Sequence, residues 1–484
     1  MSRINSNIPS MVAQRHLQIS QRSLGLALER LATGLKINRG ADNPAGLIVS
    51  ERLRSEISVA NQAINNTSRA INVIATTEGA LDEVANLLND IKALVVEAAN
   101  SGAFSDDEIA ANQLQIDASI DSISRIANTT EFAGRKLLNG ELDYVTSSVD
   151  DTRLADVQVL GASFGSQAFI PVTVDVTQSA MQAQLGYPLP GVTASGANIN
   201  LSGPDGIITL SFPASATSND IVQAVNARTD ATGIAATVSG TGGSAGVNFY
   251  SLEYGSRAFV SVTELGASGP FQVVDRLDSG VKKRAIGRDA LATINGVSTV
   301  SDGLKIGVSD SFLAVQLTLS EAYGGGAIAL GQSDFEITGG GALFQLGPEV
   351  NTNLQSNIGV KSMQANQLGN AIIGHLSDIK SGQAFALITE NFTEASKVVD
   401  EVITQVAVLR GRLGAFERDT LQPNINQLQI TVENLKSSES VIRDTDFAEQ
   451  TAELTRSQIL VQAGNSILTI ANAQSQNVLA LLGG

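Results

Sequence analysis

The chain has 484 residues, and its 31 Lys and Arg residues against 48 Asp and Glu residues give a net charge of −17. A protein this acidic is a poor general binder of nucleic acid or of anionic membranes, because both repel it. Cys is absent and His occurs only at His16 and His375, which excludes disulfides and thiol catalysis and leaves little basis for a His metal cluster.

Sequence signatures of membrane insertion and of catalysis are also missing. The chain has no run of about 18 apolar residues, so we expect no transmembrane helix. Its N-terminal residues lack the pattern of a cleavable signal peptide, so we expect it either to stay in the cytoplasm or to leave by a route that needs no cleaved signal. It has no H-E-x-x-H, no G-x-S-x-G and no Walker lysine. We expect His16 to be a surface or interface residue and His375, after Gly374, to lie in a loop or at a helix start. The sequence therefore predicts no enzyme activity, no cofactor, no metal and no membrane insertion.

Composition separates the two ends of the chain from its middle. Residues 141–350 contain 28 of the 45 Gly, 7 of the 10 Pro and 14 of the 20 aromatic residues. Pro and Gly interrupt helices, whereas aromatic side chains favour sheets. We therefore expect an α+β protein, a discontinuous multidomain chain whose ends form long coiled-coil-like helices around a β-rich, Gly- and Pro-containing central insertion.

Apolar periodicity places two helices near the N-terminus. The first has spacings of four and three residues at Leu17, Gln21, Leu24, Leu28, Leu31 and Leu35. The second begins at Pro44, after the capping residue Asn43, and continues to about residue 100. Its heptad positions are Leu53, Ala60, Thr67, Ile74, Leu81, Leu88 and Val95, with Ile57, Ile64 and Ile71 as a second row. Such a helix would be roughly 85 Å long, so we expect an elongated molecule.

Further helices follow the same rule. Ser105 and Glu108 form a capping box that begins a third helix. Near the C-terminus an apolar stripe contains Val399, Val402, Val406, Leu409, Leu413 and Phe416. Pro423 interrupts this stripe, which predicts a kink or break near Gln422. The last helix carries Phe447, Leu454, Val461, Leu468 and Leu482 on one row, with Gly464, Ala471 and Val478 on the other.

The middle of the chain has β patterns. Residues 206–265 read in order as strand, short helix and strands, with the helix over residues 220–228 begun by Ser218 or Asn219. A second β block follows over residues 290–345. The Gly runs at 324–326 and 339–341 are expected to form turns or loops, since neither has the context of a phosphate-binding loop.

Apolar stripes usually build an ordinary intramolecular helix bundle, and that alternative stays open here. Two details favour contacts between subunits. The terminal stripes are weak, with Gln21, Ser457 and Ser475 at apolar positions. Residues 1–40 carry a net charge of +5 and residues 441–484 a net charge of −2, so the two ends can attract each other. Helices that are marginal alone suit folding upon assembly.

Specific runs of sequence resemble a known family. LERLATGLKINRGADNPAGLIV at residues 28–49, RLGAFERD at 412–419 and VIRDTDFAEQTAELTRSQILVQAGNSIL at 441–468 closely resemble bacterial flagellin. The resemblance covers roughly residues 1–140 and 375–484. Residues 206–265 are similar to the insertion module of flagellins and hook-associated proteins.

This resemblance implies a structural subunit that self-assembles into the flagellar filament for swimming motility. Residues 1–42 and 441–484 would form a helical hairpin lining the filament core, 43–145 and 346–440 an inner tube, and 146–345 the variable outer domain. The subunit would be exported unfolded, would polymerise at the distal tip and would be extracellular. A hook–filament junction protein of the same superfamily is the alternative, whereas a filament-displayed metallopeptidase would need the missing H-E-x-x-H.

The resemblance also implies partners and contact residues. Expected partners are further copies of the chain, an export chaperone, the flagellar type III export apparatus, the filament cap and hook-associated junction proteins. The expected assembly seam comprises Leu17, Leu24, Leu28, Leu31, Leu35, Phe447, Leu454, Val461, Leu468, Val478 and Leu482.

One segment departs from the family. Many flagellins have a Gln-Arg-x-Arg-Glu-Leu pattern, associated with detection by a Toll-like receptor, at the positions of residues 89–94. Here the corresponding residues include Asp90, Lys92, Ala93 and Leu94, so an Arg is replaced by Asp and the Glu by Ala. We expect weak receptor detection; the alternative is that Asp90 and Lys92 are merely a solvated or subunit-facing helix surface.

Overall fold

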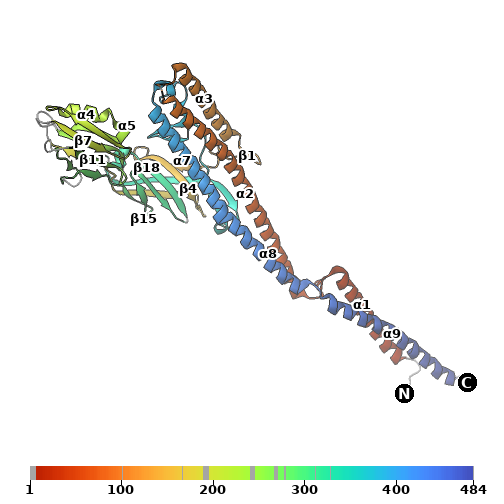
Figure 1. The fold of residues 1–484 in the computed structure, drawn as a ribbon. Helices are drawn as coiled ribbons and strands as arrows, with labels where there is room; N and C mark the ends of the chain where they lie inside the picture. Colours follow the sequence, from red (N-terminus) through yellow and green to blue (C-terminus); the bar gives the residue numbers. More distant parts are fainter. Residues whose placement is uncertain are drawn as a thin grey trace. The chain divides into compact units, whose positions relative to one another are not determined.

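The computed structural model describes residues 7–482, apart from residues 101, 166, 189–195, 240–245, 266–270, 277–279, 311 and 328, and describes side chains as far as residue 473 (Figure 1). The helices are α1 (Ile8–Thr33), α2 (Pro44–Ala98), α3 (Asp106–Thr129), α4 (Ser218–Asn226), α5 (Thr229–Thr232), α6 (Glu321–Gly324), α7 (Phe392–Phe416), α8 (Gln422–Arg443) and α9 (Phe447–Leu482). Short 3₁₀ turns are η1 (Thr352–Leu354), η2 (Leu376–Ile379) and η3 (Leu387–Thr389). None of these helices, within the described ranges, is long and apolar enough to cross a membrane.

The strands all lie between α3 and α7. They are β1 (Glu131–Phe132), β2 (Arg135–Lys136), β3 (Tyr144–Ser147), β4 (Leu154–Ala162), β5 (Ile170–Gln178), β6 (Gln182–Tyr187), β7 (Ala197–Ser202), β8 (Ile207–Phe212), β9 (Ile234–Ser239), β10 (Gly246–Tyr254), β11 (Phe259–Glu264), β12 (Val274–Asp275), β13 (Arg284–Ile286), β14 (Leu291–Ile294), β15 (Val297–Ser298), β16 (Val300–Asp302), β17 (Lys305–Ser309), β18 (Leu313–Leu319), β19 (Gly331–Gly340), β20 (Ala342–Gln345), β21 (Gln355–Ile358), β22 (Gly369–Asn370) and β23 (Gly374–His375). The expected α+β class, with helical ends and a β-rich insertion, is confirmed.

The chain divides into two compact units. The first comprises the residues up to Ser68, Leu346–Glu349 and the residues from Leu421 onward. The second comprises Arg69–Gln345 and Val350–Thr420. Each unit is built around its own buried side chains and is described by itself.

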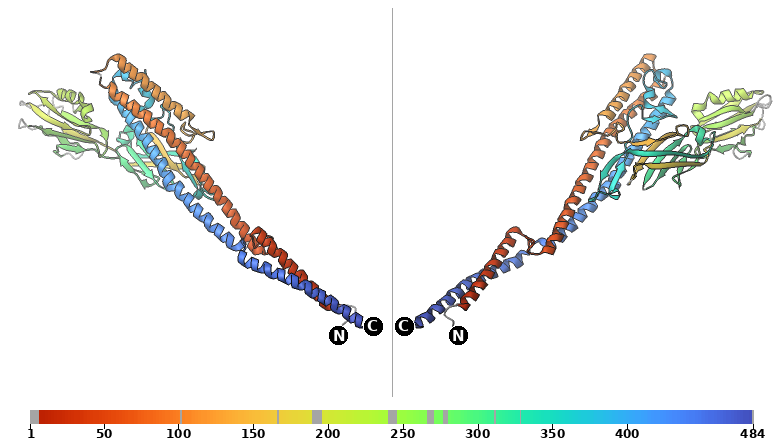
Figure 2. Two further views of the ribbon diagram at one scale, coloured as in Figure 1. Left: turned by 45° about the vertical axis from the view of Figure 1, so that its right-hand side comes forward. Right: turned by 180° about the vertical axis from the view of Figure 1, so that it is seen from behind.

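In the first unit, α1 and α9 run antiparallel, side by side in every view (Figures 1 and 2). Asn7 at the start of α1 donates its Nδ2 to the carbonyl oxygen of Ala471 at 3.1 Å, while Lys36 beyond its end donates its backbone N–H to Arg443. In the same unit, α8 packs on the first part of α2, where Ile57, Ala60 and Val432 form a small buried cluster.

Predicted helix boundaries agree with the structure. Asn43 accepts a hydrogen bond from the backbone N–H of Gly46 at 2.9 Å, directly before Pro44 begins α2. Ser105 and Glu108 form the expected capping box of α3. The break expected near Gln422 is a π-helical turn over Glu417–Leu421, which ends where α8 begins with Pro423 in its first turn.

The heptad stripe of α2 is confirmed in its first row and corrected in its second. Ala60, Thr67, Ile74, Leu81, Leu88 and Val95 are buried as expected, and so is the C-terminal stripe from Val399 to Leu413. The second buried row, however, consists of Ala63, Ala70, Thr77, Val84, Ile91 and Ala98. Of the expected second row, Ile57 is buried, whereas Ile64 and Ile71 are only half-buried, as is Leu53 of the first row. Small side chains allow neighbouring elements to approach closely, so they can occupy the contact in place of larger ones.

The second unit contains two pairs of stacked sheets. Sheets β15-β14-β5-β19-β3 and β16-β17-β18-β4 enclose one core, and sheets β12-β6-β10-β9 and β13-β11-β7-β8 enclose another. α4 adds Ile221 and Val225 to the second core. Its capping residue is Thr217, with Asp220 completing a capping box, so the expected starts at Ser218 or Asn219 were one or two residues late.

The two Gly runs differ from each other. Residues 324–326 end α6 and form the expected turn. Gly339 and Gly340 instead belong to β19, at a shift of register against β3. Gly340 has φ of 94°, and a Cβ there would lie 2.1 Å from the carbonyl oxygen of Asp143, so only Gly fits this bulge.

Candidate assembly surface

The terminal helix pair, α1 with α9, has a narrow contact face made largely of small side chains. Its buried members are Ala13, Leu17, Ala27, Gln450, Ser457 and Ala471. A Cβ added at Gly464 would lie 3.2 Å from Cδ1 of Leu17, which shows how closely the two helices approach. Ser457 is 1% exposed and its hydroxyl has no hydrogen-bond partner. The isolated pair is therefore closely packed, but it buries little apolar surface.

The expected seam residues divide by exposure. Leu17 is buried, and Leu24, Leu31, Leu35, Leu454, Val461 and Leu468 are half-buried. Leu28 and Phe447 are 50% and 60% exposed and lie off the contact face. The side chains of Ser475, Val478 and Leu482 lie outside the described residues. Gln21 is exposed, and sequence reasoning missed Ala13, Ala27 and Gln450, whose small or polar side chains carry no apolar signal.

A set of large apolar side chains remains exposed on the terminal helix pair. These residues, called here the terminal apolar surface, are Ile8, Met11, Val12, Ile19, Leu28, Phe447, Ile459, Leu460, Ile467 and Ile470. Their exposed fractions range from 41% at Val12 to 65% at Met11 and Ile470. Exposed large apolar side chains concentrated on one helix pair are typical of sites of protein–protein contact.

Backbone hydrogen bonds close the other end of the pair. Leu35 and Asp444 form an isolated antiparallel β-bridge, and Thr445 donates its N–H to the carbonyl oxygen of Gly34 at 2.9 Å. Gly34 has φ of 74°, a left-handed conformation that ends α1 without strain. The short segment between α8 and α9 is thereby fixed to the chain that leaves α1.

Opposite charge does not hold the two helices together. Across the side chains that the structure describes, no ion pair joins α1 to α9. Arg39 pairs with Glu29 at 3.0 Å, and Arg456 pairs with Glu453 of its own helix at 2.9 Å. The termini pair as expected, and the contact between them is made by small and apolar residues.

The segment expected to bear on receptor detection lies on α2. Asp90 and Ala93 are exposed, and Leu94 is half-buried. Lys92 forms an ion pair with Asp400 of α7, beside the buried Ile91. Lys92 is thus a surface group held within the chain, whereas Asp90 faces solvent.

The two His residues lie in the surroundings that the sequence predicts. His16 is exposed on α1. His375 precedes the 3₁₀ turn η2, where its backbone N–H donates to Oδ2 of Asp378 at 2.8 Å, so its prediction as a loop or helix-start residue is confirmed.

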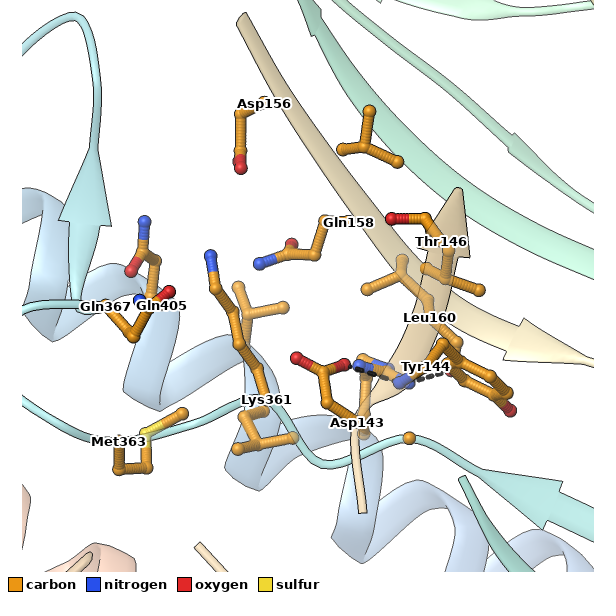
Figure 3. Close-up of a pocket in the computed structure, with 16 residues that line it drawn as sticks. Asp143, Tyr144, Thr146, Asp156, Gln158, Leu160, Lys361, Met363, Gln367 and Gln405 are labelled. Carbon is orange, nitrogen blue, oxygen red and sulfur yellow. Dashed lines mark hydrogen bonds between the residues drawn. The ribbon is translucent and has the colours of Figure 1, made fainter. Parts of the chain in front are cut away.

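A polar cavity of about 220 Å³ lies between β3, β4 and α7 of the second unit (Figure 3). Asp143, Asp156, Lys361 and Arg412 line it, and Arg412 donates a hydrogen bond from Nη2 to the carbonyl oxygen of Leu160 in β4. Burial raises the pKa of the Asp143 carboxyl, against the opposing effects of the Tyr144 N–H, Lys361 and Arg412. Burial also disfavours the charged form of the Arg412 guanidinium and therefore lowers its pKa. These groups connect α7 to the sheet.

The Asp143→Asn substitution is expected to stabilise the protein at about pH 7 and to have no effect below about pH 3. The raised pKa means that the folded state holds the carboxyl proton more tightly than the unfolded state does. The stability gained from this tighter proton binding is present at low pH. It is lost as the pH rises above about 3.9, the ordinary pKa of an Asp carboxyl, and the Asp143 carboxyl ionises. Thermal unfolding of both proteins across this range is the measurement, and lower stability of the Asn variant at neutral pH would contradict the prediction. Asn keeps the oxygen that accepts from the Tyr144 N–H.

The chain thus combines paired helical ends, exposed apolar side chains on them and a β-rich insertion, features that suit a subunit that assembles with further copies. The family model for the bacterial flagellin N-terminal helical region matches residues 4–143, and that for the C-terminal helical region matches residues 396–482. The B-type flagellin of Pseudomonas aeruginosa is 30% identical over 500 residues, which cover 99% of each chain. A flagellin of Salmonella rubislaw is 29% identical over 510 residues, again covering 99% of each. The chain belongs to the bacterial flagellin family.

The family assigns its role as a structural subunit of the flagellar filament, and the alternative of a hook-associated protein is not favoured. Two solved structures have low similarity to the chain. The flagellar cap protein FliD of Escherichia coli has a TM-score of 0.28 and 13% identity, covering 60% of this chain and 71% of that one. FlgL of Xanthomonas campestris has a TM-score of 0.28 and 11% identity, covering 81% of this chain and 99% of that one.

Proposed function

We propose that the chain polymerises through its terminal helix pair. Residues 1–42 and 441–484 line the core of the filament, residues 43–145 and 346–440 form the inner tube, and residues 146–345 face outward. The seam residues bury their apolar side chains between copies. The observation that carries this proposal is the terminal apolar surface, whose ten large side chains are exposed in the single chain.

The energetics of this surface support assembly. Full burial of one such side chain contributes about 1.5–3 kcal/mol, so even partial burial of ten of them can offset the loss of freedom on association. The close, small-residue contact between α1 and α9 keeps the apolar rows on the outside of the pair. Electron microscopy of the concentrated full-length protein tests the proposal: tubes with a central channel support it, and their absence at every concentration and salt condition contradicts it.

The proposal also includes the route by which the subunit leaves the cell. The subunit travels unfolded through the flagellar type III export apparatus, after a cytoplasmic chaperone has held its C-terminal helices. It adds to the distal tip beneath the filament cap, beyond hook-associated junction proteins, and functions outside the cell. Family membership supports this route, and a chain without Cys is compatible with it because no disulfide can form before export. The role is structural, without catalysis.

Detection of this flagellin by the flagellin-sensing Toll-like receptor is expected to be weak. Asp90 is exposed where many flagellins have Arg, and a like-charge or unpaired contact at an interface costs several kcal/mol. A cell-reporter assay on purified monomer is expected to show a response at least about 100-fold lower than that of a flagellin with the full pattern. Potent signalling would contradict the prediction.

A gain of function provides the control for this prediction. The double variant Asp90→Arg with Ala93→Glu restores two residues of the pattern at exposed positions and is expected to signal more strongly. The matched variant Asp107→Arg with Ala111→Glu makes the same exchange on exposed positions of α3 and is expected to change nothing.

A further inference from the structure

Two basic side chains on α1 have no acidic partner in their own chain. Arg15 and Arg22 are exposed and stand seven residues apart, so they lie on the same face of the helix. Neither belongs to any ion pair among the described residues. The part of α9 beside them cannot supply one, because the sequence from Ser457 to Gly484 contains no charged residue.

The acidic residues of α9 lie near its start, toward the end of the pair where α1 ends. Glu449 and Glu453 belong to the first two turns of α9. Glu449 is exposed, and Glu453 forms an ion pair with Arg456 of the same helix. The contact between Leu17 and Gly464 fixes the register of the two helices. Glu449 precedes Gly464 by fifteen residues, and Arg22 follows Leu17 by five. In this antiparallel pair Glu449 therefore lies about 15 Å along the axis from Arg22 and farther still from Arg15, beyond the reach of either side chain in the same chain.

We propose that Arg15 and Arg22 of one copy bind Glu449 and Glu453 of a second copy displaced along the helix axis. This contact rests on the proposed function, namely polymerisation through the terminal helix pair. It specifies which two surfaces of neighbouring copies meet. A helical polymer needs a head-to-tail contact between two different surfaces, and a basic and an acidic patch separated along one helix pair provide them. The terminal apolar surface supplies the burial, while the charges select the axial register.

The chemistry of the two patches fits a second copy better than any other partner. The overall charge of the chain is −17, so two random surfaces of this protein repel each other. A locally basic face of α1 is attracted to acidic surface, and the start of α9 supplies such a surface on the same terminal helix pair. Partial burial among apolar side chains strengthens these ion pairs relative to exposed ones.

Charge reversal in the full-length protein tests the contact. Three variants are compared with the wild type: R15E/R22E, E449K/E453K and the combination of all four substitutions. The R228E/K283E variant is the control, because it applies the same charge change as R15E/R22E to exposed residues in the β-rich part. Polymer is measured as the pelleted fraction after seeding with sheared wild-type filaments at about 0.15 M salt, where screening still allows close pairs to act.

Each double reversal of the patches is expected to lower the pelleted fraction by about tenfold or more, because like charges then meet at the contact. The fourfold variant, which exchanges the two patches, is expected to recover at least about half of the wild-type fraction when seeded with its own sheared polymer. Circular dichroism verifies that every variant is folded. The contact is overturned if either double-reversal variant polymerises as the wild type does, or if the fourfold variant is folded but does not recover. Either result leaves the proposed function intact. Failure of the wild type itself overturns both.

Discussion

Deletion of residues 447–484 is expected to give a soluble, folded protein that forms no filaments. The deletion removes α9, and with it the close partner of Leu17 and half of the terminal apolar surface. The second unit retains its two β cores and its helices, because none of their residues lies in α9. α1 loses its contact face, and a lone helix of its length is marginal in water.

Four measurements check this expectation against the full-length protein. Far-UV circular dichroism should show a loss of helix from α9 and α1, while the calorimetric transition of the remaining protein persists. Sedimentation should show a monomer at concentrations at which the full chain pellets. Electron micrographs should show tubes for the full chain alone. Normal filaments from the truncated protein would contradict the assignment of α9 to the assembly surface.

The helical ends could be predicted from sequence because their signals are local. Asn43 with Pro44, Ser105 with Glu108, and Pro423 each fix a boundary through chemistry within a few residues. The stripes around Ile74 and Val402 follow from large side chains at fixed spacing. The spacing of large residues favoured Ile64 and Ile71, and it passed over the neighbouring row, which begins with the small Ala63 and Ala70.

The β-rich part could be predicted only as a class. β4 pairs with β18, although about 150 residues separate them, and β19 lies between β5 and β3. No local pattern specifies which strands meet over such distances. The polar cavity is a consequence of these pairings, since it brings Asp143, Lys361 and Arg412 together from three separate segments. Sequence reasoning consequently gave no indication of it.

The candidate assembly surface lies between these two cases. Leucine spacing identified α1 and α9 as contact-forming helices, which the structure shows as a pair. Spacing alone did not distinguish the residues that hold the pair from those that remain outside it. Leu24 and Leu28 belong to the same stripe, yet Leu24 is half-buried and Leu28 is 50% exposed.

The double variant Leu24→Asp with Leu28→Asp is expected to abolish filament formation, because an unpaired charge buried in a subunit seam is costly. The two single variants should separate the contributions. Leu28→Asp leaves an exposed side chain in the isolated subunit, so its thermal unfolding should match the wild type while polymerisation is lost. Leu24→Asp should weaken the terminal helix pair as well.

The critical concentration for polymerisation measures the size of the effect. A penalty of about 3 kcal/mol per subunit corresponds to a rise of roughly 100-fold or more in that concentration, since each 1.4 kcal/mol is tenfold. Val300→Asp is the matched control, because Val300 is 84% exposed in β16 of the other unit. Normal filaments from the Leu28→Asp variant would remove Leu28 from the seam, and normal filaments from the double variant would contradict the seam on α1 altogether. If Leu28→Asp instead unfolds the isolated subunit, the Leu28 side chain already has an intramolecular role. That result would favour the alternative of an ordinary intramolecular helix bundle.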